Sequence, residues 1–266
     1  RSRLALVVLL AVVAGSSPIA AQEIFHSTQT ANLQTTETLR AGNLLFEISH
    51  RFGVPVAEGL DELFGFDGPS NIRLGLSYAP SDKVLLSLLR TNDEDNLELH
   101  AKVILAEGGS ESMPFKLGVL GGGAWNSQPV LLAGVEDNEL QFYAQLLANV
   151  LLGDRLALGL VPTFLRNPRL RDVEADNAIA LGIQAQWYAA PAVSFLAEWL
   201  ITEARAGQAY DTGTFGVEFE TRGHFFKILF TNQSRINATQ VLGGAAVPFD
   251  FDQLRVGFNI TRLLPF

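Results

Sequence analysis

Apolar and polar residues alternate along most of the chain after residue 43, in segments about nine to twelve residues long. The stretch "NLELHAKVIL" shows the pattern, because Glu98, His100 and Lys102 are each separated by an apolar residue. A period of two places alternate side chains on opposite faces and therefore predicts β-strands. We predict about twelve strands, at residues 43–52, 71–78, 83–91, 96–106, 114–125, 139–151, 155–165, 178–188, 192–203, 213–221, 224–232 and 253–263.

The length of these segments favours a membrane barrel over a soluble sheet. Strands of globular proteins have a mode of roughly five to six residues, whereas a tilted transmembrane strand needs roughly 9–11. The chain is 48% hydrophobic, but no stretch reaches the roughly 18 consecutive apolar residues of a spanning helix. Alternation alone does not say which face is internal, so a soluble lipocalin-like barrel remains a minor alternative.

The connections between the predicted strands alternate between short and long. The short ones are "APSD", "EGGSESM", "LGD", "AAP" and "RG", and the long ones include residues 53–70, 126–138 and 233–252. Short periplasmic turns and long external loops are typical of outer-membrane barrels. We therefore predict an all-β fold: a single antiparallel, up-and-down transmembrane β-barrel of about twelve strands over residues 43–266. Its last strand is expected to pair with its first.

The N-terminal stretch has the pattern of a secretory signal. Arg1 and Arg3 precede an apolar run, and Ala20 and Ala21 offer a small-residue cleavage site. We predict a signal peptide at residues 1–21, followed by a polar periplasmic lead-in at residues 22–42. An exported barrel is expected in the cell outer membrane. Removal of the two arginines would take the formal charge from −9 to −11.

Charge and cysteine content narrow the range of partners. A formal charge of −9 argues against nucleic acid, and the absence of cysteine excludes disulfides and thiolate metal sites. The acidic long loops favour solubility, although contact with divalent cations or lipopolysaccharide is an alternative. Phe266 after the last strand resembles the signal that the outer-membrane assembly machinery recognises, so membrane lipid and this machinery are the expected partners. No protein partner is specified.

Two features concern the interior of the barrel. Residues 53–70 contain "EGLDELFGFDG", which could cover the barrel mouth, fold inside as a plug, or remain an ordinary exposed loop. The polar face of the strands carries charges of nearly balanced sign, which either pair to seal a narrow barrel or line a water-filled channel. The lumen-lining candidates are Glu47, Arg51, Arg73, Glu98, His100, Lys102, Lys116, Glu198, Glu218, Glu220, Lys227 and Arg255.

Three stretches resemble a domain-of-unknown-function family of bacterial outer-membrane β-barrel proteins: "LRAGNLLFEISHRFG", "GLDELFGFDGPSNIRLGLSYAPSDK" and "RVGFNITR". The resemblance runs from about residue 39 to the end of the chain. It implies a barrel in the outer membrane and no established activity, so no functional residues follow from it.

The leading functional hypothesis is a narrow porin-like channel for passive transport of small polar solutes. The alternative is a non-conducting barrel that presents acidic loops to a partner. A lipid-modifying enzyme is a third hypothesis, but Ser49 and His50 point to opposite faces of one strand and do not pair directly. We therefore expect no enzyme activity, no catalytic residues, no cofactor and no metal site.

Overall fold

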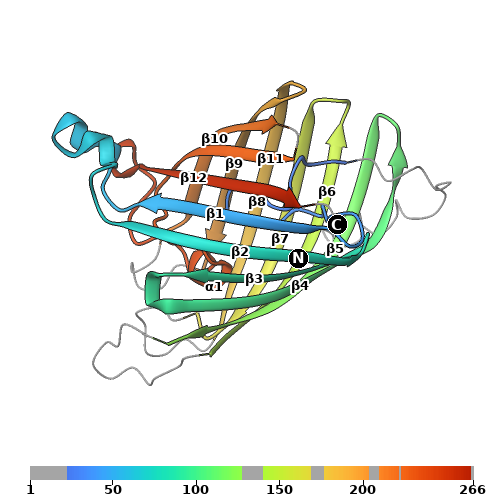
Figure 1. Ribbon diagram of the computed structural model, residues 1–266, viewed down its shortest axis with the longest axis horizontal. Coiled ribbons are helices and arrows are strands. Elements are labelled where there is room, and N and C mark those ends of the chain that lie inside the picture. The colour runs from blue at the N-terminus through green and yellow to red at the C-terminus, as the bar shows by residue number, and fades with distance from the viewer. Residues whose placement is uncertain (1–22, 128–139, 169–176, 204–209, 222, 265–266) are drawn as a thin grey trace, which may run out of the picture.

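The alternating segments form strands that close into one barrel (Figure 1). The computed structural model describes residues 23–127, 140–168, 177–203, 210–221 and 223–264. The signal peptide at 1–21 and Phe266 lie outside these residues. The described strands are β1 (Leu44–Phe52), β2 (Ser70–Ser81), β3 (Val84–Thr91), β4 (Asn96–Ser110), β5 (Met113–Asn126), β6 (Leu140–Leu152), β7 (Leu156–Arg166), β8 (Asn177–Ala190), β9 (Val193–Thr202), β10 (Thr212–Thr221), β11 (His224–Thr231) and β12 (Arg255–Leu264).

Each strand pairs antiparallel with its neighbours in the chain, and β12 pairs with β1 to close the sheet. Leu44 lies opposite Leu264 at one end of this seam, and Arg51 lies opposite Gly257 near the other. Closure leaves the sheet without a free edge. The predicted fold class is therefore confirmed, with β4 extending to Ser110 rather than ending at 106.

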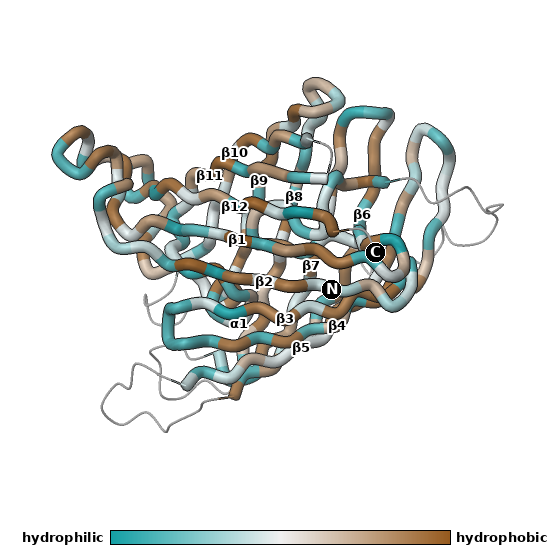
Figure 2. The backbone as a smooth tube through the Cα atoms, viewed as in Figure 1, coloured by the Kyte–Doolittle hydropathy of each residue, from teal (hydrophilic) through white to brown (hydrophobic). Residues whose placement is uncertain are grey.

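The two faces of the barrel have opposite polarity. On β4, Glu98 and Lys102 are fully buried inside, whereas Leu99 between them is 61% exposed on the outer surface. The alternation of hydrophilic and hydrophobic positions along the strands is visible in Figure 2. A soluble barrel has its apolar residues inside, so this inverted arrangement identifies the outer wall as the surface that meets lipid.

Short turns lie at one end of the barrel and long connections at the other. The turns after β2, β4, β6, β8 and β10 have two or three residues, whereas residues 53–69 and 232–254 form long connections at the opposite end. The chain enters β1 at the short-turn end, where Ala41 N donates a hydrogen bond to Asp82 Oδ1 at 2.7 Å. Among the described residues, no helix is long and apolar enough to cross a membrane.

The connection between β1 and β2 is not the plug that its sequence allowed. It contains the 3-10 turns of η1 (Val56–Gly65), which project beyond the end of β1 and leave Leu60 75% exposed (Figure 1). Phe66 after η1 packs edge-on against Phe52 at a centroid distance of 4.9 Å. Residues 53–70 are therefore an external loop anchored at the rim of the barrel.

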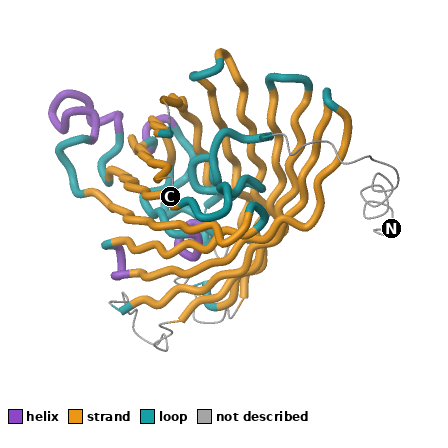
Figure 3. The backbone as a smooth tube through the Cα atoms, turned by 45° about the vertical axis from the view of Figure 1, so that its right-hand side comes forward, coloured by secondary structure: helices purple, strands orange, loops and turns teal. Residues whose placement is uncertain are grey.

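Two other segments enter the barrel instead. Residues 24–37, which we name the N-terminal hairpin, and residues 233–245, which we name the inward loop, are largely buried inside the ring of strands, where Figure 3 shows loop segments. The inward loop contains α1 (Ala238–Val241), and η3 (Phe251–Gln253) follows it outside. This differs from the expected periplasmic lead-in at 22–42. The physical reason is that the polar backbone of the hairpin supplies hydrogen bonds to charged wall residues that would otherwise be unpaired.

Candidate functional site

The lumen wall holds most of the charged residues that the strand pattern placed there. Ten of the twelve candidates are at most 7% exposed and lie on inward-facing positions: Glu47, Arg51, Arg73, Glu98, His100, Lys102, Lys116, Glu198, Glu218 and Lys227. The other two lie at the rims. Glu220 has a side chain 38% exposed near the short-turn end, and Arg255 donates to Gly53 O at the long-loop end at 2.8 Å.

Some of these charges are paired within the wall. Arg73 forms an ion pair with Glu47 on the neighbouring strand, and Lys227 Nζ lies 3.0 Å from Glu218 Oε2. Both pairs are almost fully buried. Buried charges are costly unless paired and hydrogen-bonded, so these pairs make a charged lumen compatible with a stable barrel.

A second group is built around Glu98. Tyr143 Oη donates to Glu98 Oε1 at 2.6 Å, and His100 Nδ1 lies 3.2 Å from the same oxygen. Thr239 N of the inward loop donates to the other carboxylate oxygen at 3.4 Å. This carboxylate therefore joins two wall strands to the inward loop.

The N-terminal hairpin is a narrow turn-back of the chain. Gln29 and Gln34 form an antiparallel bridge, and Thr30 N donates to Leu33 O at 2.9 Å across the tip. Glu198 of β9 holds this tip. Its Oε1 accepts the backbone N–H groups of residues 31, 32 and 33 at 2.7, 2.9 and 2.8 Å. No ion pair involves Glu198 within the described part of the chain, so the hairpin amides are what stabilise its charge.

Cations hold the carbonyl groups and the carboxylate of the hairpin. Lys227 donates to the carbonyl oxygens of residues 29 and 30, in addition to its ion pair with Glu218. Lys102 Nζ donates to Thr28 O at 2.8 Å and to Glu37 O at 2.9 Å. Lys116 Nζ lies 2.8 Å from Glu37 Oε2. The wall therefore binds the hairpin through its backbone, through the carboxylate of Glu37 and through polar side chains such as Gln29 and Asn32.

The seam of the barrel also contacts the hairpin tip. Arg51 donates to Asn259 Oδ1 at 2.8 Å within the wall and to Asn32 Oδ1 of the hairpin at 2.9 Å. Asn259 Nδ2 in turn donates to Ala31 O at 2.8 Å. Strands β1 and β12, which close the barrel, thus both bind the tip of the hairpin.

The hairpin and the inward loop meet near the middle of the lumen. Leu33 at the hairpin tip belongs to one hydrophobic cluster with Val241 and Leu242 of the inward loop. Leu147 and Val161 of the wall complete the same cluster and are fully buried. The two segments therefore enter the barrel from opposite ends and share one hydrophobic cluster inside it.

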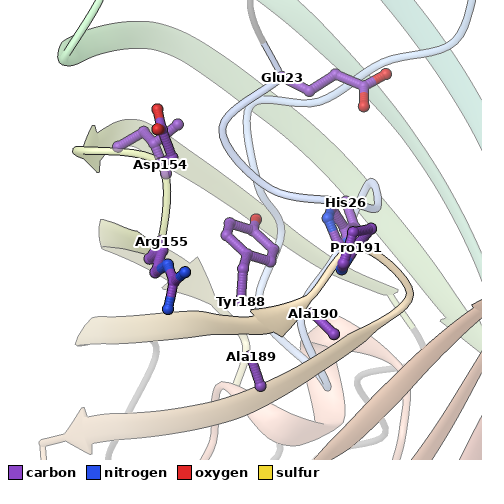
Figure 4. A pocket seen from close by; sticks show the side chains of 9 residues that line it. Glu23, His26, Asp154, Arg155, Tyr188, Ala189, Ala190 and Pro191 are labelled. Atoms are coloured by element: carbon purple, nitrogen blue, oxygen red, sulfur yellow. The ribbon is translucent and has the colours of Figure 1, made fainter.

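A cavity of about 410 Å³ opens where the hairpin enters the barrel. The His26 ring packs at a tilt against Tyr188 with ring centroids 4.2 Å apart, and Tyr188 Oη donates to Ile24 O at 2.6 Å. Asp154 and Arg155 from the β6–β7 turn line the opposite side (Figure 4). This short-turn mouth offers groups of both signs to a small polar solute.

The described residues contain no grouping of side chains that is typical of a hydrolytic site or a metal site. Ser49 is buried and bonds Glu47, whereas His50 lies on the outer face and stacks on Phe258 at 4.6 Å. Across the described ranges, no serine is hydrogen-bonded to a histidine, and no three His, Asp or Glu side chains are grouped to hold a metal ion.

The residues of the hairpin were not among the candidates derived from the sequence. Ser27, Thr30 and Asn32 are polar and uncharged, and they show no period that predicts an element. The one usable signal was Glu37, a carboxylate outside the strands in a lumen whose strand charges do not quite balance.

Comparison with solved structures finds other outer-membrane proteins. The COG4313 outer membrane channel from Pseudomonas putida F1 is similar with a TM-score of 0.51 and 14% identity, over 86% of this chain and 98% of that one. The NanC porin is similar with a TM-score of 0.49 and 11% identity, over 84% of this chain and 99% of that one. The outer membrane phospholipase A from Escherichia coli is similar with a TM-score of 0.43 and 10% identity, over 84% of this chain and 90% of that one. At these identities the similarity concerns the fold alone.

Comparison with curated proteins gives no significant match. A family model described as a membrane bound beta barrel domain matches residues 25–264, which includes the hairpin as well as all twelve described strands. The chain therefore belongs to this family of membrane-bound β-barrel domains (DUF5777).

Proposed function

We propose that the protein is an outer-membrane channel for small polar solutes, closed in this conformation by its own N-terminal hairpin. The observation that carries the proposal is the polar, charged wall, whose inward groups bond the hairpin rather than only one another. Without the hairpin, these groups would line a path compatible with water and polar solutes. Outer-membrane lipid and lipopolysaccharide are the proposed neighbours of the apolar outer wall.

The character of the interface supports displacement of the hairpin. Most of its contacts are hydrogen bonds, and water replaces such bonds at a net cost of about 0.5–1.5 kcal/mol for a neutral pair and about 1.5–3 kcal/mol where one partner is charged. Its buried apolar side chains are Ile24, Phe25, Ala31 and Leu33, which pack against the wall in three separate clusters. A permanently closed core would be expected to rely on apolar packing instead.

The same contacts favour a second candidate, a non-conducting barrel that presents its loops to a partner. The observation in favour of this candidate is the number of hydrogen bonds that the hairpin makes to Glu198, Lys102 and Lys227, because losing all of these bonds together is costly. In that case the hairpin is a permanent filling of the barrel and the external loops carry the function.

Conductance in planar lipid bilayers distinguishes the two candidates. We expect rare conductance steps for the full chain and frequent steps for a variant that lacks residues 24–37. Because the sequence has no cysteine, Asn32→Cys with Thr214→Cys can be bridged by a short bis-methanethiosulfonate, which should silence the channel until a reductant is added. Bridging Ser77→Cys with Ser87→Cys within the wall is the matched control.

The channel proposal fails if neither the hairpin deletion nor the loop variant described below conducts, although both are folded and inserted. Folding is checked by the heat-dependent mobility of the barrel on electrophoresis. Because the inward loop also occupies the lumen, a second variant with residues 234–244 replaced by a short linker is measured in parallel. Silence of both variants would support the non-conducting barrel.

A further inference from the structure

The wall contains a site that holds a carboxylate, and in this structure the carboxylate comes from the chain itself. Glu37 Oε2 is bound by Lys116 at 2.8 Å, and the carbonyl oxygen of Glu37 is bound by Lys102 at 2.9 Å. The two lysines come from adjacent strands, β4 and β5. Both are at most 7% exposed, and Glu37 itself is 7% exposed. Two buried cations thus converge on one residue of the hairpin.

Within the described part of the wall, these lysines have no carboxylate partner. Lys102 donates to Thr28 O and Glu37 O, which both belong to the hairpin, and Lys116 pairs with the Glu37 carboxylate. Glu107 lies opposite Lys116 in the β4–β5 register but is exposed and forms no ion pair with it in the described segments. Withdrawal of the hairpin would therefore leave both ammonium groups unpaired.

Two other cations of the wall have carboxylate partners there, whereas Arg51 forms no ion pair within the described residues and donates to Asn259 and to the hairpin. Arg73 keeps Glu47 and Lys227 keeps Glu218 when the hairpin is absent, because those ion pairs lie within the wall. Among the ten buried wall residues, five cations face four carboxylates. The excess positive charge matches the one carboxylate, Glu37, that the hairpin contributes.

We propose that Lys102 and Lys116 form a binding site for the carboxylate of a small anionic solute, and that Glu37 occupies this site in the closed state. This deepens the proposed channel function and rests on it for its role in transport. A carboxylate-bearing solute that reaches the short-turn mouth competes with Glu37 for the two ammonium groups. Binding of the solute then removes two of the contacts that hold the hairpin in the barrel.

The first experiment is calorimetric titration of the full chain in detergent micelles with succinate as the probe. We expect weak binding to the unchanged protein and about tenfold tighter binding to Glu37→Gln, since the competing ion pair is removed. Combining Glu37→Gln with Lys102→Gln and Lys116→Gln should abolish binding. Glu58→Gln, an exposed carboxylate in η1, is the matched control and should leave binding unchanged. Putrescine, a small dication, should not bind to any variant.

A second measurement covers the case in which Glu37→Gln fails to fold. In the unchanged protein, saturating succinate should accelerate hydrogen exchange of residues 24–37, and Lys102→Gln should remove this acceleration. The inference is overturned if succinate binds none of the folded variants, or if binding survives loss of both lysines. Because neither measurement depends on conduction, failure of this site is distinguishable from failure of the channel proposal.

Discussion

Glu198 is the residue on which the hairpin tip depends most directly, and Glu198→Gln is the sharpest test of that dependence. The substitution keeps the size of the side chain but removes the charge that three backbone amides approach at 2.7–2.9 Å. It also places a donor near Asn32 Nδ2, which now donates to Oε2 at 3.2 Å. The hairpin tip should therefore be held less tightly while the wall keeps its shape.

The magnitude follows from the number of bonds. A hydrogen bond to a charged group is worth about 1.5–3 kcal/mol, against about 0.5–1.5 for a neutral one, so each amide bond loses about 1 kcal/mol. Three such bonds give about 3 kcal/mol, which is more than a hundredfold in the opening equilibrium of the hairpin. Glu198 is 6% exposed, so solvent screening reduces this value little.

Hydrogen exchange read by mass spectrometry measures this equilibrium directly. Amides 31–33 should exchange about a hundredfold faster in Glu198→Gln, while amides in the centres of the strands keep their protection. Open events in planar bilayers should become more frequent in the same variant. Glu58→Gln removes an exposed carboxylate and should change neither measurement. Unchanged protection of amides 31–33 in Glu198→Gln would refute the assigned role.

Three further predictions concern other contacts of the fold. A Cβ on Gly182 would lie 2.8 Å from Leu33 Cδ1, so Gly182→Ala should displace the hairpin tip at a cost of about 1 kcal/mol, measured as faster hydrogen exchange of amide 33. The control is Gly121→Ala, whose added Cβ would meet nothing within 4 Å and should leave the exchange of amide 33 unchanged. Leu88→Arg on the outer face, where Leu88 is 49% exposed, should weaken folding into lipid vesicles by about 2–4 kcal/mol, and Glu111→Arg in a short turn should not. Leu63 has a left-handed φ of 47°, so Leu63→Gly should raise the unfolding temperature through relief of about 1 kcal/mol of strain, and a lowered temperature would contradict this reasoning.

The barrel could be predicted from the sequence because its determinants are local. A strand in a membrane barrel alternates between lipid and lumen, so each strand carries its own two-residue period, as in β4 with Glu98, His100 and Lys102 inside. Turn length then orders the strands, and each pairs with its neighbour in the chain. The structure places ten of the twelve candidates at buried, inward positions, whereas Glu220 and Arg255 lie at the rims.

The hairpin could not be predicted, because its determinants are distant in sequence. Ser27 bonds Glu218, 191 residues away, and Ala31 bonds Asn259, 228 residues away. Residues 24–37 show no period, because they are surrounded by the wall and bond to it through both backbone groups and polar side chains. The loop at residues 53–70 misled in the opposite way: its apolar residues suggested a segment inside the barrel, but they lie outside it.

The charge balance of the strands is the one property of the sequence that carries information about the N-terminal hairpin. The buried positions on the strands supply five cations and four carboxylates, so the wall alone is not neutral. A buried charge without a partner is too costly to be left over in a stable barrel, unless water or another part of the chain compensates it. Glu37 is the carboxylate that completes the balance, through Lys116. In a barrel whose strand charges leave one cation over, an acidic residue in a polar segment before the first strand is therefore the place to look for a plug.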